Sequence, residues 1–323
     1  ASLVDARFAP AYIGRARVLL ISNPKAKIEK DLEQAAELDP NLVDTYLVRA
    51  GYLLKMGDPE SALQDLTTVE NLNPNIPLMY AYRAQALLKL GKKEEALQDA
   101  RRAHEMDFTL LPAYLTLGQA SLANGLPRLA IDNLKTYLVY EAEDPNAWLA
   151  LGQAYYGEGR DYAKALEAYN QALTLDDQLT EAYYHRGLAY IALEEGQKAT
   201  NDLARALRLN PYSFEISIEL GHALLVAGRL EDAYRQIRSS ASLAERDDQL
   251  AVMYYWRALA QEALGNPSNA IQDWQALLDL PAEAVPQTLR QVAEEHLNTL
   301  TATATPTTTL TPSPTSTPSP TRT

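Results

Sequence analysis

Cysteine is absent from this chain of 323 residues, and histidine occurs only four times. Without thiols the protein has no disulfide, no thiolate metal ligand and no cysteine nucleophile. The four histidines include no pair three or four residues apart, the spacing that puts two metal ligands on one helix face. They are His104, His185, His222 and His296. We therefore expect no metal ion and no cofactor, and we interpret these histidines as ordinary surface or groove residues.

Basic residues are few beside the acidic ones. There are 29 lysines and arginines against 42 aspartates and glutamates, so the formal net charge is −13. Such a field repels phosphate backbones and anionic lipid headgroups, which argues against nucleic acid as a partner. Apolar runs are short, and none reaches the roughly 18 residues that a membrane helix needs. We expect no transmembrane segment.

Catalytic motifs are also missing. The chain has no Gly-X-Ser-X-Gly sequence around a nucleophile and no glycine-rich phosphate loop. Most of its glycines instead recur at regular intervals. We interpret the protein as non-enzymatic.

The sequence does contain a strong internal repeat. The sequence matches itself at a shift of 34 residues, and the match is positional rather than merely compositional. Each matching stretch begins with an aromatic residue, has a small residue four positions later, and has an alanine deep in its second half. The small residues include Ala50, Ala84, Gly152 and Gly187, and the later alanines include Ala62, Ala96, Ala165 and Ala199.

This pattern resembles the tetratricopeptide repeat, and the resemblance covers residues 9 to 281. It implies an all-α protein, a right-handed α-solenoid of about eight helix pairs, with a capping helix over 282–300. In this interpretation 9–300 is the solenoid. We place the repeats at 9–42, 43–76, 77–110, 111–144, 145–179, 180–213, 214–250 and 251–281.

Elementary packing accounts for the repeated positions. Small residues such as Gly118 and Gly152 let the two helices of a pair approach closely, while aromatic residues fill the wedge between them. Asp58-Pro59 and Asn266-Pro267 supply an N-cap followed by a proline at the first helical position. Glycines are expected at the turn inside each pair, at Gly57, Gly91, Gly125, Gly159, Gly228 and Gly265. The repeat 214–250 departs from the pattern at Ser217 and Ser240, so we expect looser packing there.

The beginning of the chain predicts an incomplete repeat. Residues 1–8 align with the last eight positions of a repeat, so the first helix of that repeat is missing. An excerpt from a longer protein, processing, or completion by another chain would each account for this.

Threonine, serine and proline make up 19 of the 23 residues from 301 to 323. Such a composition is typical of an extended linker or of an O-glycosylated stalk. The stalk resembles those of exported bacterial surface proteins and favours an exported or cell-surface location, with a cytoplasmic one still open. Because no permitted Asn-X-Ser/Thr sequence occurs, any glycan is expected to be O-linked. The candidate positions are Thr305, Thr307, Thr308, Thr309, Thr311, Ser313, Thr315, Ser316, Thr317, Ser319 and Thr321.

The family binds partners on the concave face, which its first helices line. The matching positions are Tyr82, Gln85, Gln119, Gln153, Tyr184, His185, His222, Tyr255 and Trp256. Gln85, Gln119 and Gln153 recur at one position in three consecutive repeats. They can form a ladder that pairs with an extended backbone or with sugar hydroxyls, or they can be solvated or bond one another.

Two functions fit these observations. The leading hypothesis is an interaction scaffold that binds a peptide or a partner protein in the groove. The alternative is a subunit of an extracellular, O-glycosylated fibre, in which copies stack end to end through incomplete terminal repeats.

Overall fold

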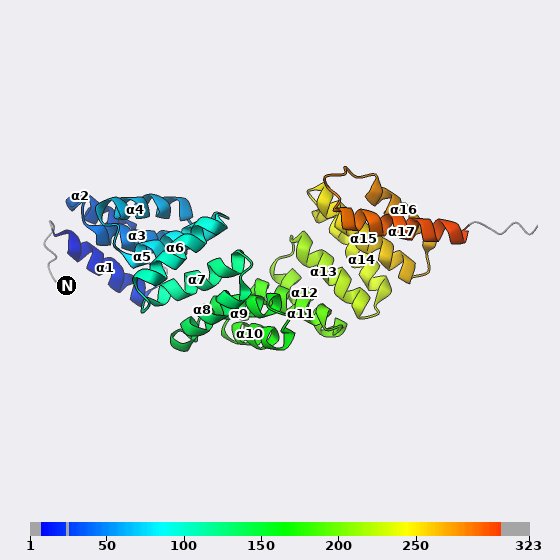
Figure 1. Ribbon diagram of the computed structural model, residues 1–323, viewed down its shortest axis with the longest axis horizontal. Coiled ribbons are helices and arrows are strands. Elements are labelled where there is room, and N and C mark those ends of the chain that lie inside the picture. The colour runs from blue at the N-terminus through cyan, green and yellow to red at the C-terminus, as the bar shows by residue number, and fades with distance from the viewer. Residues whose placement is uncertain (1–7, 24–25, 305–323) are drawn as a thin grey trace, which may run out of the picture. The chain divides into compact units, whose positions relative to one another are not determined.

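The computed structural model describes residues 8–23 and 26–304. The incomplete repeat proposed for residues 1–8, apart from Phe8, and the O-glycosylation sites from Thr305 onward lie outside these residues. The described residues form seventeen α-helices, one short 3₁₀ helix and no strand. This composition confirms the predicted all-α class (Figure 1).

The chain divides into two compact units, residues 1–189 and 190–323. The first unit contains α1 (Ala9–Ser22), α2 (Glu29–Leu38), α3 (Val43–Met56), α4 (Pro59–Leu72), α5 (Pro77–Lys89), α6 (Lys93–Met106), α7 (Leu111–Ala123), α8 (Pro127–Tyr140), α9 (Pro145–Gly157), α10 (Tyr162–Leu175) and most of α11 (Thr180–Ala192). The second contains α12 (Gly196–Leu209), α13 (Phe214–Val226), α14 (Leu230–Ser240), α15 (Asp247–Ala263), α16 (Pro267–Leu278) and α17 (Gln287–Ala304).

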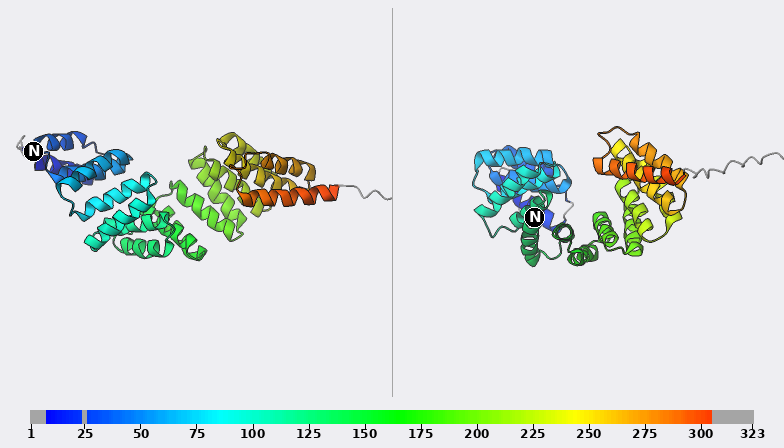
Figure 2. Two further views of the ribbon diagram at one scale, coloured as in Figure 1. Left: turned by 45° about the horizontal axis from the view of Figure 1, so that its top comes forward. Right: turned by 45° about the vertical axis from the view of Figure 1, so that its right-hand side comes forward.

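Helices pack as successive pairs within each unit. In the first unit each pair, such as α3 with α4 or α5 with α6, stacks on the next one (Figure 2). The first helices also contact one another, in the order α1, α3, α5, α7 and α9. They therefore form one continuous row of helices. In the second unit α13 pairs with α14 and α15 with α16, and α17 packs against α16.

In most pairs, the turn between the two helices contains a residue in the left-handed backbone conformation. All six predicted turn glycines have positive φ, between 61° and 85°. In the turn between α11 and α12 this conformation falls on Glu194, with φ of 59°. A side chain makes that conformation costly, because Cβ crowds the following carbonyl oxygen.

One of the two predicted N-caps forms a capping bond. The Asp58 carboxylate accepts a hydrogen bond of 3.0 Å from the backbone N–H of Ser61, with Pro59 as the first helical residue of α4. Asn266 occupies the N-cap of α16 without a side-chain cap bond. Its Nδ2 instead donates to Gln261 Oε1, so Asn266 has the predicted N-cap position without a capping bond from its side chain.

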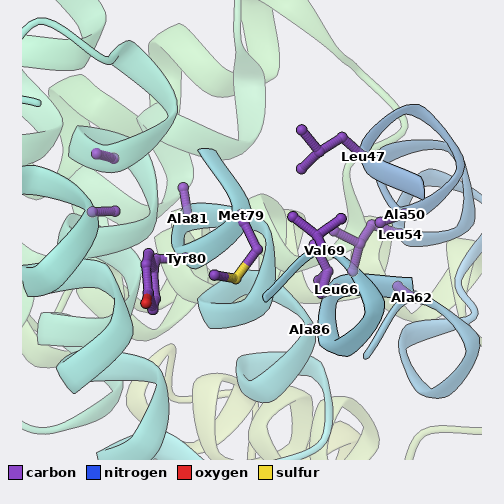
Figure 3. Packing of buried hydrophobic residues seen from close by; sticks show 12 residues of the cluster. Leu47, Ala50, Leu54, Ala62, Leu66, Val69, Met79, Tyr80, Ala81 and Ala86 are labelled. Atoms are coloured by element: carbon purple, nitrogen blue, oxygen red, sulfur yellow. The ribbon is translucent and has the colours of Figure 1, made fainter. Parts of the chain in front are cut away.

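The two helices of a pair approach each other closely at the small residues. A Cβ on Gly118 would lie 2.6 Å from Leu134 Cγ, and one on Gly152 would lie 2.4 Å from a ring carbon of Tyr169. These glycines therefore bring the helices together as predicted. Figure 3 shows the core where α3, α4 and α5 meet, which includes Leu66.

The packing predicted to be loose around Ser217 and Ser240 is tight. Both serines are buried, with 2% and 0% of their surface exposed. Gln236 Nε2 donates to Ser217 Oγ over 2.9 Å, which satisfies the hydroxyl that replaces the aromatic ring. A Cβ on Gly221 would lie 2.4 Å from Ile237 Cγ1, so the prediction of looser packing is wrong.

Two helix boundaries differ from the predicted ones. Helix α15 begins at Asp247, inside the segment assigned to the preceding repeat, and has acidic residues in its first turn, where the helix dipole favours them. Helix α17 begins at Gln287 rather than 282, after a turn between Pro281 and Pro286 that buries Val285. It continues to Ala304, so the first four residues of the predicted tail are helical.

Candidate functional site

All nine predicted groove residues lie on first helices, and all are half-buried. Six belong to the first unit, on α5, α7, α9 and α11, and three belong to the second unit, on α13 and α15. They are Tyr82, Gln85, Gln119, Gln153, Tyr184 and His185, and then His222, Tyr255 and Trp256. Because α5 contacts α7 and α7 contacts α9, the four residues on these helices follow a common row.

Two of the three glutamines of the proposed ladder share a hollow. Gln119 on α7 and Gln153 on α9 line a space of about 430 Å³ with Asn146 and an apolar floor. Gln85 does not line it. We call this space the amide hollow, and its lining residues are Gln119, Leu122, Ala123, Asn146, Leu149, Ala150 and Gln153.

Gln153 also contacts the next first helix in the chain. Its Nε2 lies 2.7 Å from His185 Nε2. The His185 ring stacks at 6.2 Å on Tyr169 and meets the edge of Tyr184 at 5.2 Å. Burial among these groups lowers the pKa of His185 to about 4, although Glu181 raises it slightly. A neutral imidazole accepts the amide N–H at Nε2 and has its own proton on Nδ1.

Tyr82 lies on α5 and packs against the neighbouring first helix α3. Its ring approaches Gly51 so closely that a Cβ there would lie 3.2 Å from the ring and the hydroxyl. Burial raises the pKa of the Tyr82 hydroxyl. Tyr82 therefore combines a packing contact with its position on the predicted groove.

The second unit has an aromatic cluster, formed by His222, Tyr255 and Trp256. The rings of His222 and Trp256 stack with centroids 3.9 Å apart and planes at 25°. Tyr255 meets Trp256 edge-on at 5.0 Å. Glu219 Oε2 accepts from His222 Nδ1 at 3.2 Å. The structure thus brings together the three groove residues predicted in this unit.

The remaining histidines have structural surroundings rather than groove positions. His296 Nδ1 lies 2.9 Å from Glu262 Oε1, which also accepts a 2.6 Å hydrogen bond from Trp274 Nε1. These bonds join α17 to α15 and α16. His104 packs edge-on against Tyr114 at 4.7 Å. Both histidines are half-buried, and both combine partial exposure with a packing contact.

Sequence reasoning missed a repeated ion pair between the two helices of a pair. Arg83 on α5 donates to both carboxylate oxygens of Asp99 on α6, at 2.6 and 3.0 Å, and its guanidinium lies 5.1 Å from the centre of the Tyr80 ring. The same arrangement recurs sixteen residues apart at Arg15 and Asp31, Arg49 and Asp65, and Arg257 and Asp273. An arginine three positions after the aromatic residue was the available signal.

Within the described part of the chain, no group of three or more acidic or histidine side chains is placed to hold a metal ion. The helices of that part include none with the length and apolar character needed to cross a bilayer.

These repeats match a known protein family. The family described as tetratricopeptide repeat matches residues 47–107, 115–180 and 184–244, and a second tetratricopeptide-repeat description matches 253–280.

Curated relatives share short stretches with the chain. Small glutamine-rich tetratricopeptide repeat-containing protein 2 of Mycosarcoma maydis is 26% identical over 111 residues, 34% of this chain and 31% of that protein. Human tetratricopeptide repeat protein 28 is 33% identical over 92 residues, 28% of this chain and 4% of that protein. The chain thus spans about a third or less of the length of these relatives.

Solved structures show the same fold at low identity. The Cut9 and Hcn1 hetero-tetramer of the APC/C has a chain that matches 84% of this one, over 52% of its own length, with a TM-score of 0.65 and 18% identity. The PilF protein of Pseudomonas aeruginosa matches 66% of this chain and 95% of its own, with a TM-score of 0.52 and 20% identity.

Proposed function

Because this chain belongs to the tetratricopeptide repeat family, whose members are generally protein-interaction scaffolds, we propose that it binds an extended peptide segment of a partner protein along its first helices. The observation that carries this proposal is the amide hollow, in which Gln119 and Gln153 come from the first helices of two successive repeats.

The chemistry of the hollow suits an extended backbone. A side-chain amide offers one carbonyl oxygen and two N–H donors, and each peptide unit offers one acceptor and one donor. Leu149 and Ala150 add an apolar floor for a partner's side chain. His185 holds Gln153 from one side, so part of the ordering cost of that side chain is met before binding.

A peptide-display selection tests the proposal. Random peptides displayed on phage would be selected on the intact chain, and the affinity of the selected peptides compared between the wild type, Gln119→Ala and Gln153→Ala. Each substitution should weaken binding by about tenfold, the effect of losing one well-formed hydrogen bond to a buried group. Gln98→Ala, on the exposed surface of α6, is the control. Peptides that bind both groove variants as tightly as the wild type would refute the proposal.

End-to-end association is a second candidate, and the exposed face of α1 favours it. Phe8 is 55% and Val18 65% exposed. The position of Val18 corresponds to Tyr52 in α3 and Ala86 in α5, which are both buried. That face resembles a surface that other repeats cover with a preceding helix pair.

Sedimentation over a range of concentrations tests this association. If α1 mediates it, the average mass of the wild type rises with concentration, and Val18→Lys abolishes the rise. Tyr212→Lys, at a residue 84% exposed in the second unit, should leave the rise unchanged. A wild type of constant monomer mass would exclude the fibre, and the intact mass of residues 305–323 would test the proposed glycans separately.

A further inference from the structure

A second hollow lies among α8, α9 and α10, and it shares no residue with the amide hollow. Its volume is about 450 Å³. We call it the apolar hollow, and its lining residues are Lys135, Leu138, Val139, Trp148, Leu151, Tyr155, Lys164, Glu167, Ala168 and Gln171. Most of them lie on the second helices α8 and α10.

The equivalent interface two repeats earlier has a cleft of about 550 Å³, but its lining is charged. There Arg83 on α5 donates to Asp99 on α6 over 2.6 Å and to Glu70 on α4 over 2.6 Å. The three side chains join three helices, and they line the cleft between α4 and α6. An arginine network therefore occupies this position of the repeat.

Around the apolar hollow all three charged positions are apolar. Once the residue inserted in the turn before α10 is allowed for, Glu70, Arg83 and Asp99 correspond to Leu138, Leu151 and Ala168. These three residues line the hollow and are 6%, 4% and 2% exposed. The later cleft therefore has an apolar surface where the earlier one has a charged network.

The ring-bearing and exposed residues of the hollow indicate what it could receive. Trp148 and Tyr155 belong to its lining, and aromatic rings favour edge-to-face or offset contact with another ring. Val139, 74% exposed, lies at its rim. The volume lies within the range of about 300 to 1,000 Å³ typical of ligand sites, which is ample for one large side chain.

The charged residues at the rim of the hollow indicate which residue type would lie next to that large side chain in the partner. Lys164 is engaged by Asp161, with a 2.7 Å ion pair, and lies 5.5 Å from the centre of the Tyr155 ring. Lys135 is exposed and forms no ion pair with the described residues. Glu167 is the single carboxylate of the lining. A partner carboxylate beside the hollow would therefore pair with Lys135.

We propose that the apolar hollow is a second protein-binding site, which receives an aromatic side chain of a partner segment whose neighbouring acidic residue pairs with Lys135. This site is separate from the peptide-binding row of first helices, and its test does not depend on that row.

The test uses the full chain and a peptide array. Peptides on the array have a central tryptophan flanked by aspartate or by lysine, and free N-acetyltryptophanamide serves as a small-molecule probe. The double variant Leu151→Arg with Ala168→Asp introduces the ion pair of the earlier repeats and so replaces the apolar lining with a charged one. Peptides with flanking aspartate should bind the wild type and lose about tenfold or more in affinity for the double variant.

Further variants and a second measurement make the test specific. Lys135→Glu should weaken binding of the aspartate peptides and reverse the preference for aspartate over lysine, while Gln98→Ala, on the exposed surface of α6, should have no effect. On the wild type, methyl NMR signals of Leu138, Leu151 and Ala168 should shift when peptide is added. Three results would each overturn the proposal. They are an unchanged affinity of the aspartate peptides for the double variant, methyl signals that do not shift, and binding of N-acetyltryptophanamide as tight as that of the peptides.

Discussion

The side-chain amide of Gln153 donates a hydrogen bond of 2.7 Å to the imidazole of His185 and so joins α9 to α11. The bond requires an imidazole nitrogen that is not protonated. Burial supplies this condition, because it lowers the pKa of His185 to about 4. The groove of the first unit therefore has a neutral histidine at neutral pH.

A dependence of stability on pH follows from His185. In the unfolded chain a histidine binds a proton below a pKa of about 6.5, but in the folded protein it does so only below about 4. The unfolded state therefore binds more protons between these values, so the free energy of unfolding should fall by up to about 3 kcal/mol as the pH is lowered from about 6.5 to about 4. Urea unfolding at several pH values should show this slope, and His185→Gln should reduce it. An NMR titration that gives His185 a pKa near 6.5 would contradict the account.

Glu194 offers a way to stabilise the second unit. Its φ of 59° is costly for any residue with a Cβ, so Glu194→Gly should raise the free energy of unfolding by roughly 0.5 to 1 kcal/mol. Gly228→Ala introduces a Cβ at φ of 72° and should lower it by about 1 kcal/mol. Denaturant unfolding measures both. A loss of stability in Glu194→Gly would show that the side chain contributes more than the backbone costs.

The half-buried ion-pair network of Arg83 should contribute more to the free energy of unfolding than an exposed ion pair does. Arg83→Leu leaves the carboxylates of Asp99 and Glu70 without their partner, at a cost of about 2 kcal/mol in unfolding free energy. Arg229→Ala breaks a more exposed pair with Asp232 and should cost less than about 0.5 kcal/mol.

A double variant separates the ion pair from the packing around it. Arg83→Leu combined with Asp99→Ala should recover more than half of the loss, because Leu151 and Ala168 show that the repeat accommodates an apolar pair at these positions. Equal destabilisation by the single and double variants, measured by urea unfolding, would mean that the cost of Arg83→Leu lies in packing.

The hydroxyl of Tyr169 provides a contrasting case. It is buried and has no hydrogen-bond partner among the described residues, so Tyr169→Phe should raise stability by about 1 kcal/mol. Tyr80→Phe removes a hydroxyl that donates 3.1 Å to the carbonyl oxygen of Pro74 and should lower it by a similar amount. Thermal melts of the two variants should move in opposite directions, and a loss in both would contradict this assignment.

The fold was predictable where one residue determines a local geometry. Turn glycines such as Gly57 have positive φ, and Gly152 allows close packing, as expected from their places in the repeat. Prediction failed where a second group intervened. Gln236 compensates for Ser217, a partner that no local pattern reveals.

The candidate site was predictable by position but not by contact. The repeat placed Gln119 and Gln153 on equivalent first-helix positions, and they line one hollow. The hydrogen bond from Gln153 to His185 depends on how successive pairs stack, which spacing alone does not define. The apolar character of the second hollow depends on three replacements spread over three helices, including Leu151, and becomes visible only when repeats are compared in space.

Site-specific photo-crosslinking tests most directly whether partners bind along the first helices. A benzophenone amino acid would replace Gln119 on α7 in one variant and Gln98 on α6 in another, and each would be irradiated with a peptide selected by the wild-type chain. The account predicts crosslinks from position 119 and none from position 98. Crosslinks from position 98 alone would place the partner on the second helices and contradict the proposed groove.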